Sequence, residues 1–287
     1  MFSRKFVLTN CLAIATSMLA GCASYKNESG LPKWLDDASE ANRLGYFMGL
    51  SLKDSPAPEG FDPSKNTLMS DLTFSTLAHS NALPGTDIGS FSLELGLSLA
   101  TNLLKHEEEE YSQATMWFPA ASFDSETAAY ETAMAHLSQS VKASAEKTGY
   151  KVYKSTAFTV FGRHYKSLWV ENDKVNCHQS ERDSERCFLY VSFDDDAMVD
   201  KPYEPASYLG LTFSPAWKIP RLRVTQKSPK TAKLEQDMPT VLSDLAQNLP
   251  DNTWLFVAPM KIDGHWTAPY VSDGKSAHFF IKPKKAN

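Results

Sequence analysis

Four aspartates between residues 194 and 200 form the densest group of oxygen ligands in the chain. Asp194, Asp195 and Asp196 are consecutive, and Asp200 follows four positions later. Carboxylate oxygens at short spacing are typical calcium ligands. The segment lacks the glycine and the distal glutamate of an EF-hand loop, and an acidic turn at the end of a strand explains it equally well. We therefore predict no metal site.

No set of residues forms a recognisable catalytic motif. The segment Gly96-Leu-Ser-Leu-Ala100 superficially matches a nucleophile elbow, but it lies inside a helical pattern and not at a strand-to-helix turn. The sequence contains no glycine-rich phosphate loop, no His-Glu-x-x-His and no Cys-x-x-Cys. The seven histidines are scattered, and no pair has the spacing of metal ligands. We predict no catalytic residue and no cofactor; a catalytic set built from residues distant in the sequence would show no such motif.

The N-terminus has the composition of an export signal. Arg4 and Lys5 precede a mostly apolar run, residues 6–20, which is shorter than the roughly 20 apolar residues of a membrane-spanning helix. The run ends in Leu19-Ala20-Gly21-Cys22. These features predict that residues 1–21 are a signal peptide, removed on export.

Leu19-Ala20-Gly21-Cys22 resembles the lipobox of bacterial lipoproteins, and the resemblance covers residues 1–24 only. It implies that Cys22 is lipidated and becomes the mature N-terminus, with residues 22–33 as lipidated terminus and polar tether. Ala23 and Ser24 lack the aspartate that retains enterobacterial lipoproteins in the inner membrane. The resemblance therefore implies an outer-membrane protein that faces the periplasm. An ordinary cleaved signal with a chance cysteine, or an uncleaved anchor, is the alternative.

The remaining cysteines predict a disulfide. Cys11 leaves with the signal and Cys22 carries the lipid, so Cys177 and Cys187 remain, ten positions apart. In an oxidising envelope such a pair is expected to bond, closing an entirely polar loop. A redox-active pair is the competing interpretation, but such cysteines usually stand two residues apart.

Charge and length limit the function further. The formal net charge is −5 for the whole chain and −7 once the signal with its two basic residues is removed, which argues against a nucleic-acid partner. About 265 residues remain, enough for one large domain or two small ones. We expect residues 34–287 to form a periplasmic domain that is helical to about residue 110 and rich in strands after it.

Apolar periodicity and turn residues predict the elements of this domain. The longest predicted helix begins at Asp124 or Ser125 and ends at Gly149, and a hairpin around Gly162 follows it. A proline-rich loop is expected at 202–220, with an exposed strand after it. The other predicted helices cover 34–52, 62–77, 88–104 and 238–249, and the other predicted strands 115–118, 187–193, 221–225, 254–257 and 278–281.

The order of these elements predicts an α+β fold with a mixed or antiparallel sheet and packed helices. A ferredoxin-like βαββαβ core is compatible with residues 115–257, although the region 162–236 is longer than that core needs. Location and missing catalytic motifs favour a non-catalytic, lipid-anchored binding or assembly protein, accessory to an envelope complex, whose partners are the membrane and another envelope protein. The alternatives are an envelope hydrolase acting on cell wall, lipid or protein, and a lipoprotein that neutralises a periplasmic toxin.

Overall fold

The computed structural model describes residues 30–56, 111–180, 182, 186–262, 265–266 and 269–282. The signal peptide, Cys22, most of the tether and the helices predicted at 62–77 and 88–104 lie outside the described residues. Within the described part, no helix has both the length and the apolar composition needed to span a membrane.

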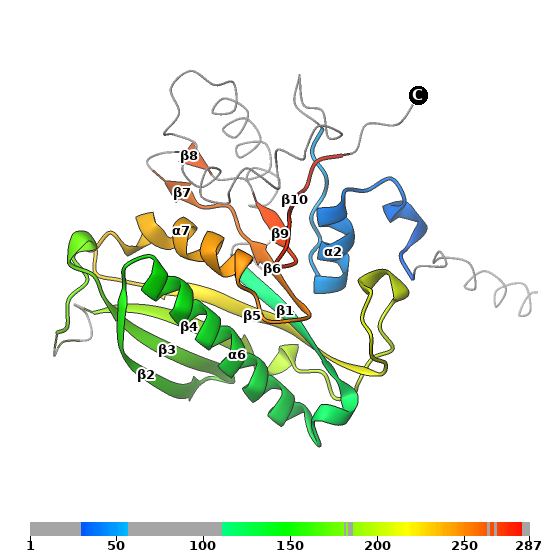
Figure 1. Cartoon of the computed structure of the whole chain (residues 1–287), viewed down its shortest axis with the longest axis horizontal. Coiled ribbons are helices and arrows are strands. Elements are labelled where there is room, and N and C mark those ends of the chain that lie inside the picture. Colours follow the sequence, from blue (N-terminus) through cyan, green and yellow to red (C-terminus); the bar gives the residue numbers. More distant parts are fainter. Residues whose placement is uncertain are drawn as a thin grey trace, which may run out of the picture.

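An antiparallel eight-stranded sheet forms the centre of the fold, in the order β10-β9-β6-β1-β5-β4-β3-β2 (Figure 1). The α+β class predicted from the sequence is therefore present, and the sheet is antiparallel. A separate two-stranded ribbon joins β7 and β8. The strands are β1 Ser112–Pro119, β2 Lys151–Val160, β3 Arg163–Glu171, β4 Cys187–Asp194, β5 Ala216–Lys227, β6 Thr253–Val257, β7 Lys261–Ile262, β8 His265–Trp266, β9 Tyr270–Ser272 and β10 Ala277–Phe279.

Three α-helices and five short 3-10 helices accompany the sheet in the described part of the chain. Residues of the first α-helix lie before the sheet in sequence, and those of the other two lie between its strands. The α-helices are α2 Glu40–Met48, α6 Glu126–Lys147 and α7 Leu234–Gln247, and the 3-10 helices are Lys33–Leu35, Ala120–Ser122, Asp173–Val175, Asp195–Ala197 and Ser207–Leu209.

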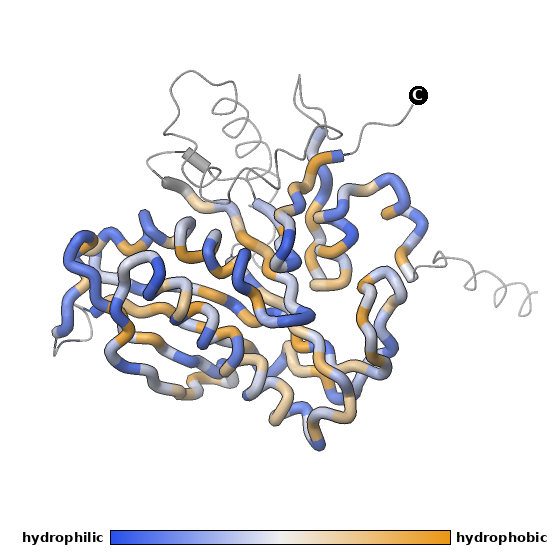
Figure 2. Tube along the Cα trace, in the orientation of Figure 1, coloured by the Kyte–Doolittle hydropathy of each residue, from blue (hydrophilic) through white to orange (hydrophobic). Residues whose placement is uncertain are grey.

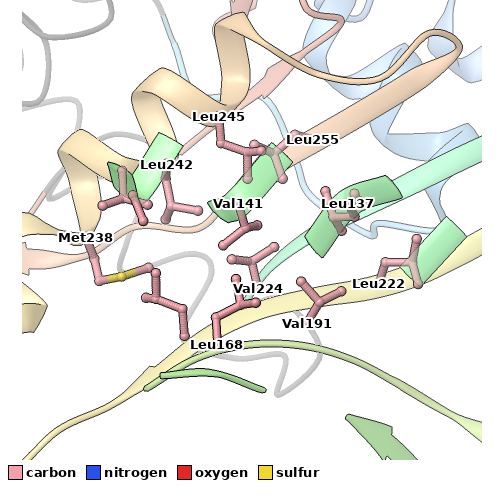
Figure 3. Close-up of a cluster of buried hydrophobic side chains, with 14 of the residues drawn as sticks. Leu137, Val141, Leu168, Val191, Leu222, Val224, Met238, Leu242, Leu245 and Leu255 are labelled. Atoms are coloured by element: carbon pink, nitrogen blue, oxygen red, sulfur yellow. The ribbon is translucent and has the colours of Figure 1, made fainter. Parts of the chain in front are cut away.

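Helices α6 and α7 cover one face of the sheet. The hydroxyl of Ser125 caps α6 by accepting from the backbone N–H of Ala128 at 3.3 Å, as an N-cap serine does. Leu137 and Val141 of α6 are fully buried, and Leu245 of α7 joins them in the main core (Figure 3). Hydrophobic and hydrophilic residues alternate along both helices, as helices with one face on a sheet require (Figure 2).

Helix α2 packs on the opposite face, but only over the β6-β9-β10 end of the sheet (Figure 1). Leu44 and Met48 of α2 form a second core with Phe256 and Phe280. Consecutive residues of a strand point to opposite faces of the sheet, so Leu255 of β6 lies in the main core and Phe256 lies in the second core. No described helix packs on the α2 side of β2, β3 and β4.

The structure corrects the prediction for residues 202–220. Strand β5 begins at Ala216, inside the predicted loop, and lies in the middle of the sheet between β1 and β4, not at an exposed edge. Pro220 is tolerated because it stands where the β1–β5 register shifts, next to Arg221 with its positive φ of 57°. Helix α7 also begins four residues earlier than expected, and β9 was not predicted.

Candidate binding face

Aromatic side chains gather on the face of β2, β3 and β4 that points away from α6 and α7. Leu168 and Val170 of β3 belong to the main core, so the odd-numbered residues of β3 point to the other face. The register places residues of β2 and β4 beside them. Five of these residues are Phe158, Tyr165, Trp169, Phe188 and Tyr190, and a sixth, Tyr153, meets Trp169 edge to face with ring centroids 6.1 Å apart.

These rings form one connected set. Phe158 stacks on Tyr165 with centroids 4.9 Å apart, and Tyr165 meets Tyr190 edge to face at 5.9 Å. Tyr190 stacks on Phe188 at 5.6 Å, and Phe188 meets Trp169 edge to face at 5.4 Å. Offset and edge-to-face pairs of this kind are each worth roughly 0.5–1.5 kcal/mol beyond the area they bury. The rings therefore form a preorganised set, in which Phe158 is 41% exposed, Phe188 is buried and the other three are partly exposed.

Basic side chains surround the rings. The Nζ of Lys154 lies 4.0 Å from the ring centroid of Trp169, and the guanidinium carbon of Arg186 lies 4.4 Å from the same centroid. Arg223 and Lys227 follow on β5, opposite Ser192 and Phe188. Together with Arg163 they make five cations on the face of a chain whose net charge is −5. We call these five cations and the five rings the aromatic–basic face.

Asp194 lies at one end of this face, and its place explains the acidic cluster seen in the sequence. Its carboxylate accepts hydrogen bonds from Arg163 and Arg223, while Asp195 pairs with His164. Asp195 and Asp196 form the first turn of a 3-10 helix. Among the described residues, no group of three or more histidine, cysteine or acidic side chains is arranged to hold a metal ion.

The disulfide supports the same face. Cys177 and Cys187 are bonded, with Cα atoms 5.6 Å apart, and both are fully buried. The bond ties the start of β4 to the segment after β3. Because Arg186 and Phe188 flank Cys187, the bond also holds these two side chains beside Trp169.

A hydroxyl, an imidazole and a carboxylate meet at the β2–β3 hairpin, which bears on the hydrolase alternative. Thr159 Oγ1 lies 3.1 Å from His164 Nδ1, and His164 Nε2 lies 2.6 Å from Asp195 Oδ1. Acyl hydrolases use such a chain, but they place it in a site that excludes water. Here the Asp195 side chain is 58% exposed and Thr159 is exposed as well. We assign the cluster to hairpin stability.

Lys218, on the same side of the sheet, is a basic residue whose pKa is lowered. It is half-buried on β5 opposite Trp117, with its Nζ 5.8 Å from the ring centroid. Burial lowers the pKa of Lys218 to about 8, and the charge of Arg221 adds to the effect. Among the described residues, no carboxylate lies within ion-pair distance of it.

The sequence contained a signal for this face that is not a catalytic motif. In β4 the aromatic residues Phe188 and Tyr190 alternate with residues of the main core, so they point to the opposite face of the sheet. A strand with apolar residues on both faces is normally buried on both, as in the interior of a layered domain. Among the described residues, no helix packs on this second face of β4.

No family model, no curated protein and no solved structure matches the chain.

Proposed function

We propose that this chain is a lipid-anchored outer-membrane lipoprotein whose periplasmic domain is non-catalytic and holds another envelope protein on the aromatic–basic face. The lipobox at Leu19-Ala20-Gly21-Cys22 supports the location, because lipidation of Cys22 with more than one acyl chain gives stable membrane anchoring. The protein would thus act as an accessory subunit that keeps its partner at the membrane.

The aromatic–basic face is the observation that carries the proposal. Tyr, Trp and Arg are the side chains that contribute most to protein interfaces, and they are effective when packed as a rigid set. The stacked pair Phe158 and Tyr165 and the two cations over Trp169 meet this description. The five cations, of which two share Asp194, favour a partner with an acidic surface.

We further infer a ferredoxin-like unit beneath this face. Strands β6, β1, β5 and β4 are adjacent in that order, and α6 and α7 connect them on one face. This order matches the βαββαβ plan if the hairpin of β2 and β3 is an insertion between α6 and β4. The insertion accounts for the extra length noted in the sequence, and it supplies three of the five rings.

Photo-cross-linking in intact cells tests the proposal. A photoreactive phenylalanine analogue replaces Tyr165 on the face, or Gln139 on the exposed side of α6 as the matched control. We expect a discrete cross-linked product from position 165 and none from position 139. The double variant Lys154→Glu and Lys227→Glu should reduce the product at least fivefold, since both replacements reverse a charge on the face.

Two outcomes would refute the proposal. Irradiation could give no product from position 165, or equal products from positions 165 and 139. The anchor is tested in the same cells, because Cys22→Ala should leave an unprocessed precursor without lipid, which does not reach the outer membrane, and should remove the product. A product that is unchanged in Cys22→Ala would show that anchoring plays no part in binding.

A further inference from the structure

The outer edge of β2 is the longest free strand edge among the described residues. β2 spans Lys151–Val160 and is the last strand of the sheet, with β3 as its partner on the inner side. At the other end of the sheet, β10 has only three residues, and Ser55 forms a bridge to Ile281 just beyond it. A free edge of ten residues can pair with another strand through its backbone.

The hairpin geometry shows which backbone groups of β2 point outward. The turn has two residues, Phe161 and Gly162, both with positive φ, as in a type I′ turn. Residues that flank such a turn exchange both hydrogen bonds, so Val160 is bonded to Arg163 and the pattern alternates along β2. The N–H and C=O groups that point away from β3 therefore belong to Ser155, Ala157 and Thr159.

The side chains along this edge determine what can pair with it. Lys154, Phe158 and Val160 point to the aromatic–basic face, and Phe158 and Val160 are 41% and 43% exposed. Phe161 at the tip is fully exposed. β2 contains two lysines and no acidic residue; Lys151 pairs with Glu171 of β3 at 2.7 Å, and Lys154 lies over Trp169, with no carboxylate among the described residues paired to it. A second β2 from another copy would bring lysines to an edge that is already basic, and edge lysines normally prevent such pairing.

We propose that the outer edge of β2 binds an extended, acidic segment of the partner protein by strand addition. The partner strand would pair with the outward groups of Ser155, Ala157 and Thr159, and every second side chain would reach the aromatic–basic face. An acidic side chain would lie beside Lys154, and apolar side chains beside Phe158 and Val160. This inference rests on the proposed function and specifies how the partner is held.

Synthetic peptides and the full mature protein in detergent test this mode of binding. The probe is a blocked ten-residue peptide with Thr at every second position and Val and Asp at the others, and its control carries Lys in place of Asp. The acidic peptide should bind at least tenfold more tightly in fluorescence anisotropy. It should also slow hydrogen exchange in residues 151–160, because the outward amides become bonded.

Two replacements of Ala157 separate strand addition from simple charge attraction. Ala157→Pro removes an outward N–H without removing a β2–β3 hydrogen bond, so the hairpin is retained while the added strand loses its central bond. Ala157→Thr keeps the N–H and is the matched control. We expect at least a tenfold loss of affinity for the acidic peptide in Ala157→Pro and less than a twofold change in Ala157→Thr.

The inference is overturned if neither peptide binds, if both bind equally, or if Ala157→Pro binds as the wild type does. It is also overturned if the protein without peptide forms dimers that Ala157→Pro abolishes, because a second copy would then occupy the edge. Cross-linking from position 165 distinguishes this failure from failure of the proposed function. A product that persists in Ala157→Pro cells would leave the binding face intact and reject strand addition alone.

Discussion

Arg223 on β5 donates a hydrogen bond from Nη1 to Oδ2 of Asp194 on β4, over 2.9 Å. Arg163 on β3 donates to the same carboxylate from its Nη2, over 3.0 Å. One carboxylate thereby joins three strands at the end of the aromatic–basic face. Burial by itself raises the pKa of Asp194, but the hydrogen bond from Arg163 and the charges of Arg223 and Arg163 outweigh burial and lower the pKa.

We expect Asp194→Asn to reduce the free energy of unfolding by about 1–3 kcal/mol at pH 7, because it leaves two arginines without their shared charge. A carboxyl whose pKa is lowered in the folded state stabilises the fold above its ordinary value of 3.8, and this stabilisation is lost as the pH falls through the lowered pKa. The difference between variant and wild type should therefore shrink as the pH falls below 3.8. Urea denaturation at several pH values measures it.

The exposed pair Lys142 and Glu146 on α6 provides the control for this prediction. Their charged atoms are 3.8 Å apart, and the side chains are 39% and 47% exposed. Exposed pairs one helical turn apart contribute about 0.3–0.5 kcal/mol, so Glu146→Gln should have little effect. If Asp194→Asn proved as mild as Glu146→Gln, the three-strand connection would contribute nothing to stability.

Lys218→Met should stabilise the protein at pH 7. Burial lowers the pKa of Lys218 to about 8 from its ordinary 10.5, so the charged form costs free energy in the folded state. This destabilisation is greatest below pH 8. It decreases as the pH rises from about 8 to 10.5, because in that range the unfolded chain binds more protons than the folded chain does. Because the side chain is half-buried, we expect a gain of roughly 1–2 kcal/mol at pH 7.

Thermal melts of Lys218→Met at pH 7 and pH 10 measure this gain, with Lys142→Met on the exposed side of α6 as the matched control. The advantage of Lys218→Met should be smaller at pH 10, and Lys142→Met should be neutral at both. A lower melting temperature for Lys218→Met at pH 7 would instead show that the ammonium group is stabilised where it lies.

Replacing both Cys177 and Cys187 by alanine should lower the free energy of unfolding by roughly 2.7 kcal/mol, the chain-entropy estimate for an 11-residue loop. Alanine suits both positions because each cysteine is fully buried in the main core. Denaturant titration measures the loss. A reducing agent should destabilise the wild type by a similar amount and leave the double variant unchanged; an equal effect on both proteins would contradict the prediction.

Cys22→Ala should leave an unprocessed precursor without lipid, because the lipobox cysteine is the residue that is acylated before cleavage. Mass spectrometry of the purified protein measures the N-terminus and any attached acyl chains. An unmodified Cys22 in the wild type, or a mature N-terminus at another residue, would remove the basis for the outer-membrane location.

Elements with strong local signals were predicted closely from the sequence. Ser125 caps α6, and the turn at Phe161 and Gly162 closes the hairpin, as the sequence indicated. The cysteine pairing was also predicted, from compartment and count. These features depend on contacts within a few residues or on one covalent bond, so the local sequence contains the required information.

The start of β5 and the cover of the sheet were decided by tertiary structure. Pro220 is typical of a loop in the sequence. It is accommodated in a central strand because the β1–β5 register shifts at this position, where no backbone N–H is required. The sequence predicts Asp194 in an acidic turn, but its carboxylate binds Arg163 and Arg223, which are 31 and 29 residues away in the chain. Such contacts depend on which strands become neighbours, which periodicity within one segment does not specify.

The sequence by itself determined the α+β class, the disulfide and the alternation that places Phe188 and Tyr190 on one side of β4. Tertiary structure alone decided which end of this side of the sheet the described helices cover. Helix α2 packs over the β6-β9-β10 end of the sheet and leaves the β2-β3-β4 end without a described helix. The physical reason is that alternation specifies two faces for every strand, whereas burial of either face depends on the placement of residues distant in the chain.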